Sequence, residues 1–263
     1  MWQWFEAIIL GLVQGLTEFI PISSSGHLVI AQTLLTGAGD HLFLEFINIG
    51  TFLALLVFFR KRIWRIIIDV CKHRNYRLAI NILLTALPAG IIGYALSDII
   101  ASTPFFTSTL VVVFTLAIVG VFLVVLEKLP KRSPVNDGER LSWWRALIIG
   151  GAQVLALIPG TSRSGSTIIA GRLMGLSAAE AAEYSFLASL PIMCGVTLKV
   201  LASDHAYLTA HLGTLVVSNA VAFISGLIAV GFLMNFLARH TLAVFGWYRI
   251  ALAAILAIIL VAQ

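Results

Sequence analysis

The chain has 263 residues, of which 60% are hydrophobic and only 11% are charged, and its mean hydropathy is +1.01. Soluble domains carry about 25% charged residues, so this composition excludes a water-soluble fold. The apolar runs are continuous rather than alternating, which excludes an outer-membrane β-barrel. We therefore expect an all-α integral membrane protein whose partners include the surrounding lipids. The net charge of +5 lies mostly in two basic segments, and we expect no nucleic-acid partner.

Eight apolar segments approach the length of about 20 residues that crosses a bilayer as a helix. They lie near residues 4–20, 42–59, 78–98, 105–126, 146–158, 180–200, 212–236 and 243–261. The first and the fifth run directly into segments rich in Ser, Gly, Thr and Pro. Such segments make poor lipid-facing spans but are tolerated where protein buries them. We therefore predict six transmembrane helices and two re-entrant helical hairpins, at about 4–36 and 146–175.

Two basic loops set the predicted topology. The loop 60–77 contains seven Lys and Arg residues, and the loop 127–145 contains five. The positive-inside rule places both loops in the cytoplasm, and the two spans between them agree with this placement. The first hairpin then opens on the extracytoplasmic side and the second on the cytoplasmic side. We expect a multi-pass protein of the inner (plasma) membrane whose site opens to the extracytoplasmic side.

An internal repeat relates the two hairpins. When residues 7–36 are placed on residues 146–175, an offset of 139, eleven of thirty positions are identical, and they include Gln, Gly and Ser. The whole chain, 1–263, is therefore predicted to be one membrane domain made of a first repeat, 1–126, and a second repeat, 146–263. Because the hairpins open on opposite sides, the repeats are predicted to be inverted. Inversion brings the hairpin tips together near the bilayer midplane.

The tip of the first hairpin concentrates groups suited to chemistry. Gln14 and Glu18 lie four residues apart and therefore share one helix face. A carboxylate inside a bilayer costs roughly 2.5–3.5 kcal/mol on insertion scales, so it normally faces a partner or a cavity. Carboxylate and amide oxygens suit Mg²⁺ or Ca²⁺, and Glu18 could instead accept a proton. Ser24 supplies a candidate nucleophile, and His27 a candidate acid or base.

The tip of the second hairpin suits an anion. Its Ser- and Gly-rich turn opens a helix, which presents backbone N–H groups and a positive dipole end, and Arg163 adds a planar fork matched to phosphate oxygens. In the repeat alignment Arg163 falls on Ser24, and Leu157 falls on Glu18, so each half supplies what the other lacks. The remaining predicted substrate contacts are Ser23, Ser25, Ser162, Ser164, Gly165 and Thr167.

Simpler roles compete with these assignments. Ser and Gly in membrane helices often only permit close packing. Glu18 and Arg163 could form a purely structural ion pair, and His27 could be an ordinary hydrogen-bonded interior residue. Glu45 and Glu183 each stand near the start of a predicted span, and they are ambiguous between helix-start charges and groups that support the site.

Arg249 stands in the last predicted span beside Trp247 and Tyr248. Aromatic residues gather at membrane–water interfaces, where basic side chains also reach the headgroups. We therefore interpret Arg249 as an interfacial anchor rather than as a ligand. The charges of the two basic loops are interpreted as determinants of topology, without a part in the chemistry.

Two motifs carry a resemblance to a known family. The first, at 14–27, is Gln, three residues, Glu and then P-x-S-S-x-G-H; the second, at 159–167, is P-G-x-S-R-S-G-x-T. With these motifs the chain resembles the bacterial undecaprenyl-diphosphate phosphatases of the bacitracin-resistance type over nearly its whole length. The resemblance implies removal of the terminal phosphate from the C55 isoprenyl diphosphate, which recycles the lipid carrier of cell-wall synthesis. It also implies Mg²⁺ or Ca²⁺ as cofactor, and it leaves a homodimer open.

Residue roles follow from the same resemblance. It implies that Glu18 is the essential acid, Ser24 the candidate nucleophile and His27 an acid or base. It also implies that Arg163 clamps the diphosphate, with Ser162 and Thr167 as supporting phosphate contacts. Gln14 departs from family members that have Glu at this position. Compared with Glu, Gln keeps an oxygen ligand but loses a negative charge, which predicts a weaker cation site. Asn48 also departs, because many relatives carry a longer Gln or His there, and no role is assigned to it.

Two functions of different classes fit this sequence. The first is a lipid-diphosphate phosphatase, in which the nucleophile is either Ser24, or water or His27 with Ser24 as a ligand only. The second is a lipid-phosphate transporter or flippase, because inverted repeats with broken helices at the midplane are also the architecture of secondary transporters. Phosphate release from protein in detergent, where no gradient exists, separates the two.

Overall fold

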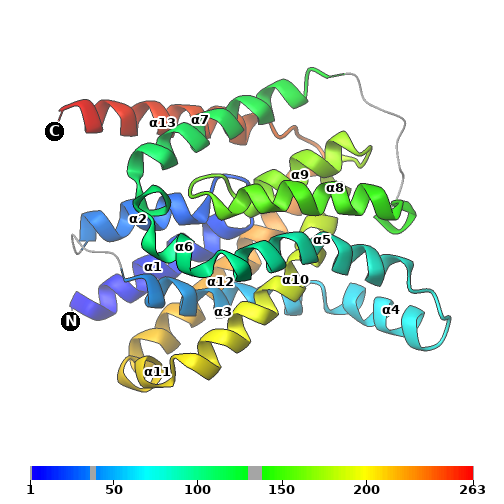
Figure 1. Ribbon diagram of the computed structural model, residues 1–263, viewed down its shortest axis with the longest axis horizontal. Helices are drawn as coiled ribbons and strands as arrows, with labels where there is room; N and C mark the ends of the chain where they lie inside the picture. The colour runs from blue at the N-terminus through cyan, green and yellow to red at the C-terminus, as the bar shows by residue number, and fades with distance from the viewer. Residues whose placement is uncertain (1, 36–39, 130–137, 263) are drawn as a thin grey trace.

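A computed structural model describes residues 2–35, 40–129 and 138–262 (Figure 1). Helices are the regular elements throughout these ranges, and no strand occurs within them. The prediction of an all-α protein is confirmed. The end of the first predicted hairpin at residue 36 and the middle of the predicted loop 127–145 lie outside the described residues.

Six helices of the described chain are long and apolar enough to span a membrane. They are α3 (His41–Phe58), α5 (Arg77–Ala95), α7 (Thr109–Leu126), α10 (Ala178–Ser203), α12 (Leu212–Leu237) and α13 (Ala243–Ala262). Each overlaps a predicted span, so the prediction of six such helices is confirmed. Large apolar side chains are exposed along all six helices. In water they would form a very large exposed apolar surface, whereas in a membrane they face lipid.

Four shorter helices form two pairs. Helix α1 (Trp2–Glu18) packs on α2 (Ser24–Leu35). Helix α8 (Trp143–Val154), extended by the 3-10 turn η3 (Leu155–Leu157), packs on α9 (Arg163–Leu173). A turn that contains proline separates the members of each pair, because proline cannot continue a helix. These short paired helices are compatible with the two predicted re-entrant hairpins, whose entry and exit on one side stay a prediction.

The two halves of the chain use matching contacts. Helix α1 packs against α12 as α8 packs against α5, and α7 and α13, the last spans of the two halves, pack against each other. Aligned glycines allow the first two approaches: a Cβ atom on Gly11 would lie 2.4 Å from the carbonyl oxygen of Ser218, and one on Gly150 would lie 2.8 Å from that of Thr85. This pattern is compatible with the predicted inverted repeat, which stays a prediction.

Adjacent glycines in α8 test this packing. Gly150→Ala drives a methyl group into the backbone of α5, and overpacking of this kind typically costs about 1–3 kcal/mol. Gly151→Ala meets nothing within 4 Å, and alanine exceeds glycine in helix propensity by roughly 1 kcal/mol. We expect the first substitution to lower the thermal unfolding midpoint in detergent and the second to preserve or raise it. A midpoint for Gly150→Ala at or above that of Gly151→Ala would contradict the close approach of α8 to α5.

The basic segment 60–77 does connect two spans, but most of it is the helix α4 (Arg60–Cys71), which was not predicted from the sequence. The density of Arg and Lys lowers the mean hydropathy of this segment and hides an apolar stripe at helical spacing. The stripe consists of Ile63, Ile66, Ile67 and Val70. No residue of α4 is fully buried, which is typical of an amphipathic helix at a membrane surface. The other short elements are α6 (Ser97–Ser102), α11 (His205–Ala210), η1 (Pro104–Thr107) and η2 (Gly138–Arg140).

Candidate active site

Both hairpin tips adopt the same unusual backbone. Ser23 and Ser162, which are aligned in the repeat, have φ angles of 75° and 73°, a left-handed region that few residues other than glycine adopt. Each directly precedes a helix, and its hydroxyl accepts a hydrogen bond from the N–H of Gly26 (3.4 Å) or Gly165 (3.1 Å). Backbone strain of this kind costs about 1–3 kcal/mol and persists only where the surroundings hold it. The starts of α2 and α9 therefore share one constrained geometry.

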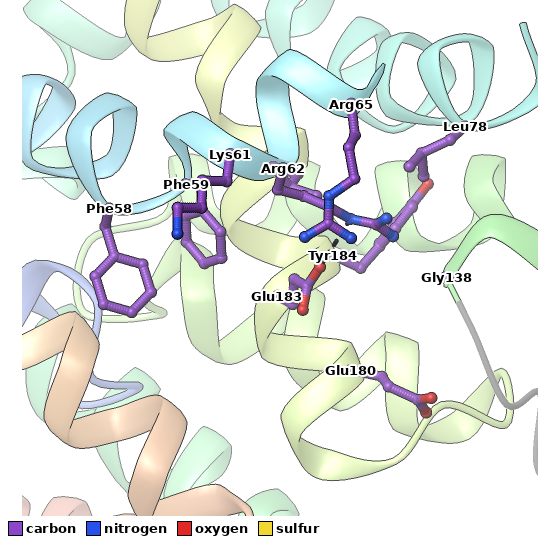
Figure 2. A pocket seen from close by; sticks show the side chains of 11 residues that line it. Phe58, Phe59, Lys61, Arg62, Arg65, Leu78, Gly138, Glu180, Glu183 and Tyr184 are labelled. Carbon is purple, nitrogen blue, oxygen red and sulfur yellow. Dashed lines mark ion pairs between the residues drawn. The ribbon is translucent and has the colours of Figure 1, made fainter. Parts of the chain in front are cut away.

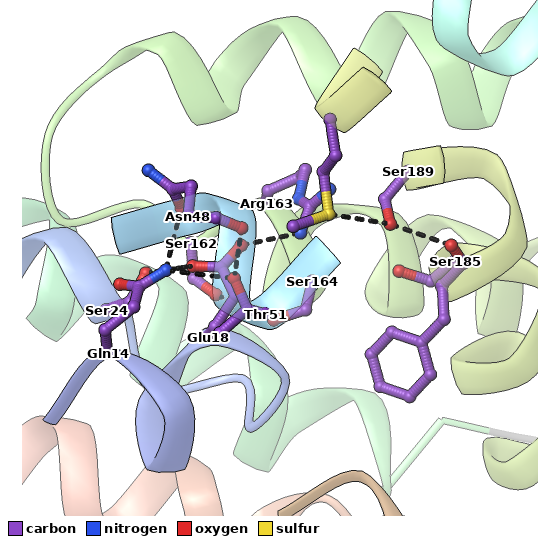
Figure 3. A network of polar contacts seen from close by, with 12 residues as sticks. Gln14, Glu18, Ser24, Asn48, Thr51, Ser162, Arg163, Ser164, Ser185 and Ser189 are labelled. Atoms are coloured by element: carbon purple, nitrogen blue, oxygen red, sulfur yellow. Dashed lines mark hydrogen bonds and ion pairs between the residues drawn. The ribbon is translucent and has the colours of Figure 1, made fainter. Parts of the chain in front are cut away.

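Glu18, the last residue of α1, is the centre of a buried polar network (Figure 3). Its carboxylate accepts hydrogen bonds from Ser24 Oγ (2.6 Å) and Gln14 Nε2 (3.3 Å). It also forms an ion pair with Arg163 Nη2 at 2.6 Å. The side chains of Glu18 and Arg163 are only 12% and 18% exposed. The fold thus brings together four residues that the sequence assigned to one site, and they come from both halves of the chain.

Helix α3 adds two residues that sequence reasoning did not assign to the site. Gln14 Nε2 donates to Asn48 Oδ1 (2.7 Å) and to Thr51 Oγ1 (3.4 Å). Asn48 and Thr51 lie three residues apart, so they share the face of α3 that meets α1. The signal in the sequence that could have placed them at the site was the presence of two polar residues at this spacing within an apolar span.

The other serines of the tips bond within their own turns. Ser23 Oγ lies 3.2 Å from Ser25 Oγ, and the aligned Ser162 Oγ lies 3.1 Å from Ser164 Oγ. Ser164 Oγ also approaches the carbonyl oxygen of Ile20 at 3.5 Å, which links the second tip to the first. These hydroxyls lie at the starts of α2 and α9, where their predicted contacts with substrate stay predictions.

Hydroxyl groups of α9 and α10 make separate contacts. Thr167 Oγ1 lies 2.5 Å from Ser185 Oγ on α10. Ser189 Oγ, also on α10, donates to the carbonyl oxygen of Phe186 at 2.7 Å and lies 3.7 Å from the sulfur of Met193 (Figure 3). Thr167, Ser185 and Ser189 are all buried. The hydroxyl of Thr167 therefore bonds α10 rather than Glu18, and its predicted contact with substrate stays a prediction.

His27 is held by two hydrogen bonds in the first tip. Its Nδ1 atom lies 2.7 Å from the carbonyl oxygen of Ser23, and its Nε2 atom lies 2.7 Å from the hydroxyl of Tyr248 on α13. The His27 and Tyr248 rings stack with centroids 5.7 Å apart. Because a carbonyl can only accept, Nδ1 carries a proton, and in the neutral ring Nε2 accepts from Tyr248. Within the described chain, neither ring nitrogen bonds Ser24 or Glu18.

The interpretation of Arg249 as an interfacial anchor is wrong. Its side chain is fully buried, and its guanidinium donates to five backbone carbonyls. These belong to Pro21 (3.2 Å), Thr115 (3.3 Å), Leu116 (3.4 Å), Gly160 (2.7 Å) and Thr161 (3.2 Å). Aromatic neighbours in sequence suggested an interface, but the tight packing of α7 on α13 turns Arg249 toward the hairpin tips instead.

The two glutamates that the sequence left ambiguous lie outside the network. Glu45 pairs with His41 at 3.4 Å, and Glu183 pairs with Arg62 of α4 at 3.0 Å. Glu183, Arg62 and Arg65 line a cavity of about 440 Å³ between α4 and the start of α10 (Figure 2). None of the residues that line this cavity belongs to the network around Glu18.

A second cavity, of about 350 Å³, is lined by residues of α1, α2, α3, α11 and α12, and none of them belongs to the network around Glu18. The hydroxyl of Tyr207 in α11 donates to Asp40 at its edge. Burial, and then the hydrogen bond and charge of Asp40, raise the pKa of Tyr207 above its ordinary value. Tyr207 therefore stays protonated near neutral pH, which suits a structural hydrogen bond.

The chemistry of the donor set fits a hard divalent cation. Glu18 offers a carboxylate, Asn48 an amide oxygen, and Ser24 and Thr51 hydroxyls, all within one network, and Gln14, which faces them through Nε2, would offer its amide oxygen if the amide turned over. Oxygen ligands of this kind are those that Mg²⁺ and Ca²⁺ prefer, and Mg²⁺ is often held by one or two carboxylates together with substrate phosphates. No cluster of three or more His, Cys, Asp or Glu side chains occurs in the described part of the chain. The set therefore suits a cation that the substrate helps to hold.

The fold and the site together define a class: a polytopic helical membrane protein with a buried, arginine-paired carboxylate where two helix N-termini meet. Such a site suits a phosphorylated ligand. The chain belongs to the family of the bacitracin resistance protein BacA, whose family model matches residues 7–255.

Relatives cover almost the whole chain. Undecaprenyl-diphosphatase 2 of Paramagnetospirillum magneticum is 37% identical over 258 residues, which cover 97% of this chain and 98% of the relative. Undecaprenyl-diphosphatase 1 of Clostridioides difficile is 37% identical over 95% of this chain and 94% of the relative. The undecaprenyl-diphosphatase of Nitrosomonas europaea is 38% identical over 95% of this chain and 92% of the relative.

Proposed function

We propose that the protein hydrolyses undecaprenyl diphosphate to undecaprenyl phosphate and inorganic phosphate. This reaction recycles the lipid carrier of cell-wall synthesis and gives resistance to bacitracin. The observation that carries the proposal is the contact of one carboxylate with both a hydroxyl and a guanidinium: Glu18 lies 2.6 Å from Ser24 Oγ and 2.6 Å from Arg163 Nη2. A base, a nucleophile and a phosphate-binding cation thereby meet at one point.

The geometry favours Ser24 as nucleophile and Glu18 as base. In this mechanism Ser24 Oγ attacks the terminal phosphorus and its proton passes to Glu18 across the 2.6 Å hydrogen bond. The bond between that phosphorus and the bridging oxygen breaks, and the lipid monophosphate leaves. Water then cleaves the phosphoserine and releases inorganic phosphate. Arg163 touches Glu18 through Nη2, so its other donors can bind phosphate oxygens and offset their charge.

The rival mechanism uses water or His27 as nucleophile and leaves Ser24 as a ligand. Against His27 stand its two hydrogen bonds, to Ser23 and Tyr248, which occupy both ring nitrogens. Rapid-quench labelling with a ³²P-labelled terminal phosphate decides between the mechanisms. We expect acid-stable phosphoserine at position 24. Phosphohistidine, or no adduct, would favour the rival.

The direct test of function is release of inorganic phosphate from undecaprenyl diphosphate by purified protein in detergent, with Mg²⁺, Ca²⁺ or EDTA. Release in detergent, where no second compartment exists, is what a phosphatase gives and a transporter does not. The names of the relatives favour the phosphatase over the transporter. No release from a folded protein that binds the lipid would return the transporter to first place.

A divalent cation, Mg²⁺ or Ca²⁺, would be held by Glu18 and Gln14 together with the substrate diphosphate. When bound, it would add positive charge beside the phosphoryl group. Gln14 contributes at most a neutral oxygen, and its amide nitrogen now donates to Asn48 at 2.7 Å. The amide would have to turn over to offer that oxygen.

Gln14→Glu tests this cation site. A second carboxylate one helical turn from Glu18 raises the ligand charge, and ligand charge tunes the affinity of oxygen sites for divalent cations. We expect the Mg²⁺ concentration that gives half-maximal phosphate release to fall about tenfold. Gln3→Glu is the control, because it adds the same charge to α1 at an exposed position. An unchanged Mg²⁺ requirement in Gln14→Glu would argue against a cation at this position.

The orientation that we propose follows from the positive-inside rule. The basic helix α4, with Arg60, Lys61, Arg62 and Arg65, would lie on the cytoplasmic surface of the inner membrane. The first hairpin, and the site with it, would then open to the extracytoplasmic side. Labelling of a single cysteine at the exposed position 65 by a membrane-impermeant maleimide in intact cells, on a cysteine-free background, tests this orientation. Labelling without permeabilisation would overturn it.

A further inference from the structure

Arg249 is the residue that ties both hairpin tips to the helical scaffold. From α13 it donates to Pro21 of the first tip and to Gly160 and Thr161 of the second. The same guanidinium donates to Thr115 and Leu116 of α7, the helix that packs along α13. One side chain therefore bridges four segments that are far apart in the sequence.

The surroundings of Arg249 explain how a full charge is tolerated there. A buried guanidinium is expensive unless polar partners compensate it. In the described chain its compensation comes from the dipoles of the five carbonyls rather than from an ion pair with a carboxylate. Arginine presents five donors in a planar fork, and lysine presents a single ammonium group. The arrangement therefore requires arginine for its shape as well as for its charge.

The bonds of Arg249 act on the strained parts of the tips. Thr161, whose carbonyl it holds, directly precedes Ser162 with its φ of 73°. Because the peptide unit is planar and trans, fixing that carbonyl also fixes the direction of the Ser162 N–H. Pro21, held in the first tip, lies two residues before Ser23 with its φ of 75°. Strained backbone persists only where neighbours over-determine it, and Arg249 supplies that constraint for both tips.

We propose that Arg249 is a positioning residue that clamps the two tips in register, so that Ser24 and Arg163 meet Glu18 at 2.6 Å. It acts through the backbone and touches neither substrate nor the reacting atoms. Tyr248 reinforces the clamp, because its hydroxyl holds His27 of the first tip. This inference rests on the proposed phosphatase activity of the same site.

Arg249→Lys and Arg249→Met test the clamp by two measurements in detergent. The first is amide hydrogen exchange by mass spectrometry of peptides that cover the tips, 20–26 and 158–166. We expect exchange there to rise at least about tenfold in Arg249→Met and less in Arg249→Lys, with peptides of α3 and α12 unchanged. The second is phosphate release per folded molecule. We expect kcat to fall at least about a hundredfold in Arg249→Met and about tenfold in Arg249→Lys, and we expect KM to change much less.

Arg172→Met is the matched control, since Arg172 is also a largely buried arginine but pairs with Glu127 and caps the end of α9, away from the tips. It should alter stability without raising exchange at the tips or lowering kcat per folded molecule. If Arg249→Met does not fold, Arg249→Lys, which keeps the charge, decides. Wild-type exchange and kcat in Arg249→Lys would overturn the clamp, as would equal losses of kcat in Arg172→Met and Arg249→Met. An inactive wild-type protein would instead defeat the proposed function, and the exchange experiment would still report on the clamp.

Discussion

Glu18→Gln is expected to lower kcat for phosphate release by about a thousandfold while leaving the protein folded, since a positioned general base contributes about 10²–10⁴-fold. The amide cannot take the proton of Ser24 Oγ, which now lies 2.6 Å from a carboxylate oxygen. It also removes the counter-charge of Arg163, which lies 2.6 Å from the other oxygen. The measurement is single-turnover phosphate release beside a melting curve for each variant.

Two further variants separate the chemical role of Glu18 from an ion pair that only supports the fold. Glu18→Asp keeps the charge but shortens the reach, so we expect partial activity. Glu45→Gln is the matched control, because Glu45 pairs with exposed His41 and lies outside the network. A Glu18→Gln protein that melts lower but keeps wild-type kcat would mean that the Glu18–Arg163 pair is structural. A Glu45→Gln protein with the same loss would mean that the effect is not specific to the site.

The spans and the motifs were predictable because each depends on neighbouring residues. Hydropathy averages over a window, so long apolar runs such as α7 give a clear signal in the sequence alone. The same averaging failed for α4, where basic residues masked the stripe that Ile63 and Ile67 belong to. Pairing of Gln14 with Glu18 followed from helical spacing. Their meeting with Arg163 followed from the complementary tips of the repeat.

The partners of residues that reach the site from distant helices were not predictable. Asn48 bonds Gln14 across 34 positions of sequence, and Tyr248 bonds His27 across 221. A polar residue in an apolar span marks Asn48 locally, but no local pattern names its partner, because both contacts arise from the way that α3 and α13 pack. Arg249 was misread for the same reason, since its neighbours in sequence are aromatic and its neighbours in space are carbonyls. Long-range packing decided these three roles.

The two tips show how one backbone geometry supports different chemistry. Ser23 and Ser162 share their φ angle and their bond to a glycine N–H. Side chains differ one position later, where Ser24 stands in the first tip and Arg163 in the second. A matched pair of helix starts thereby supplies a hydroxyl from one side and a guanidinium from the other. Only one carboxylate serves both, because Leu157 occupies the position that aligns with Glu18.

Arg163→Ala is expected to lower kcat/KM for phosphate release by about 10³-fold, since arginines that stabilise a transferring phosphoryl group contribute about 10³–10⁵ in rate. Truncation removes the cation that faces the phosphate oxygens and leaves Glu18, whose side chain is 12% exposed, without its ion-pair partner. Arg163→Lys keeps the charge but loses the planar fork that matches phosphate. We therefore expect it to recover only part of the activity, about a tenth to a hundredth of the wild-type value.

The control for Arg163 is Arg239→Ala, which removes an exposed arginine at the end of α12 and should leave kcat/KM unchanged. An Arg163→Ala protein with near wild-type kcat/KM would show that the guanidinium does not bind the diphosphate, and an equal loss in Arg239→Ala would show that the effect is not specific to the site.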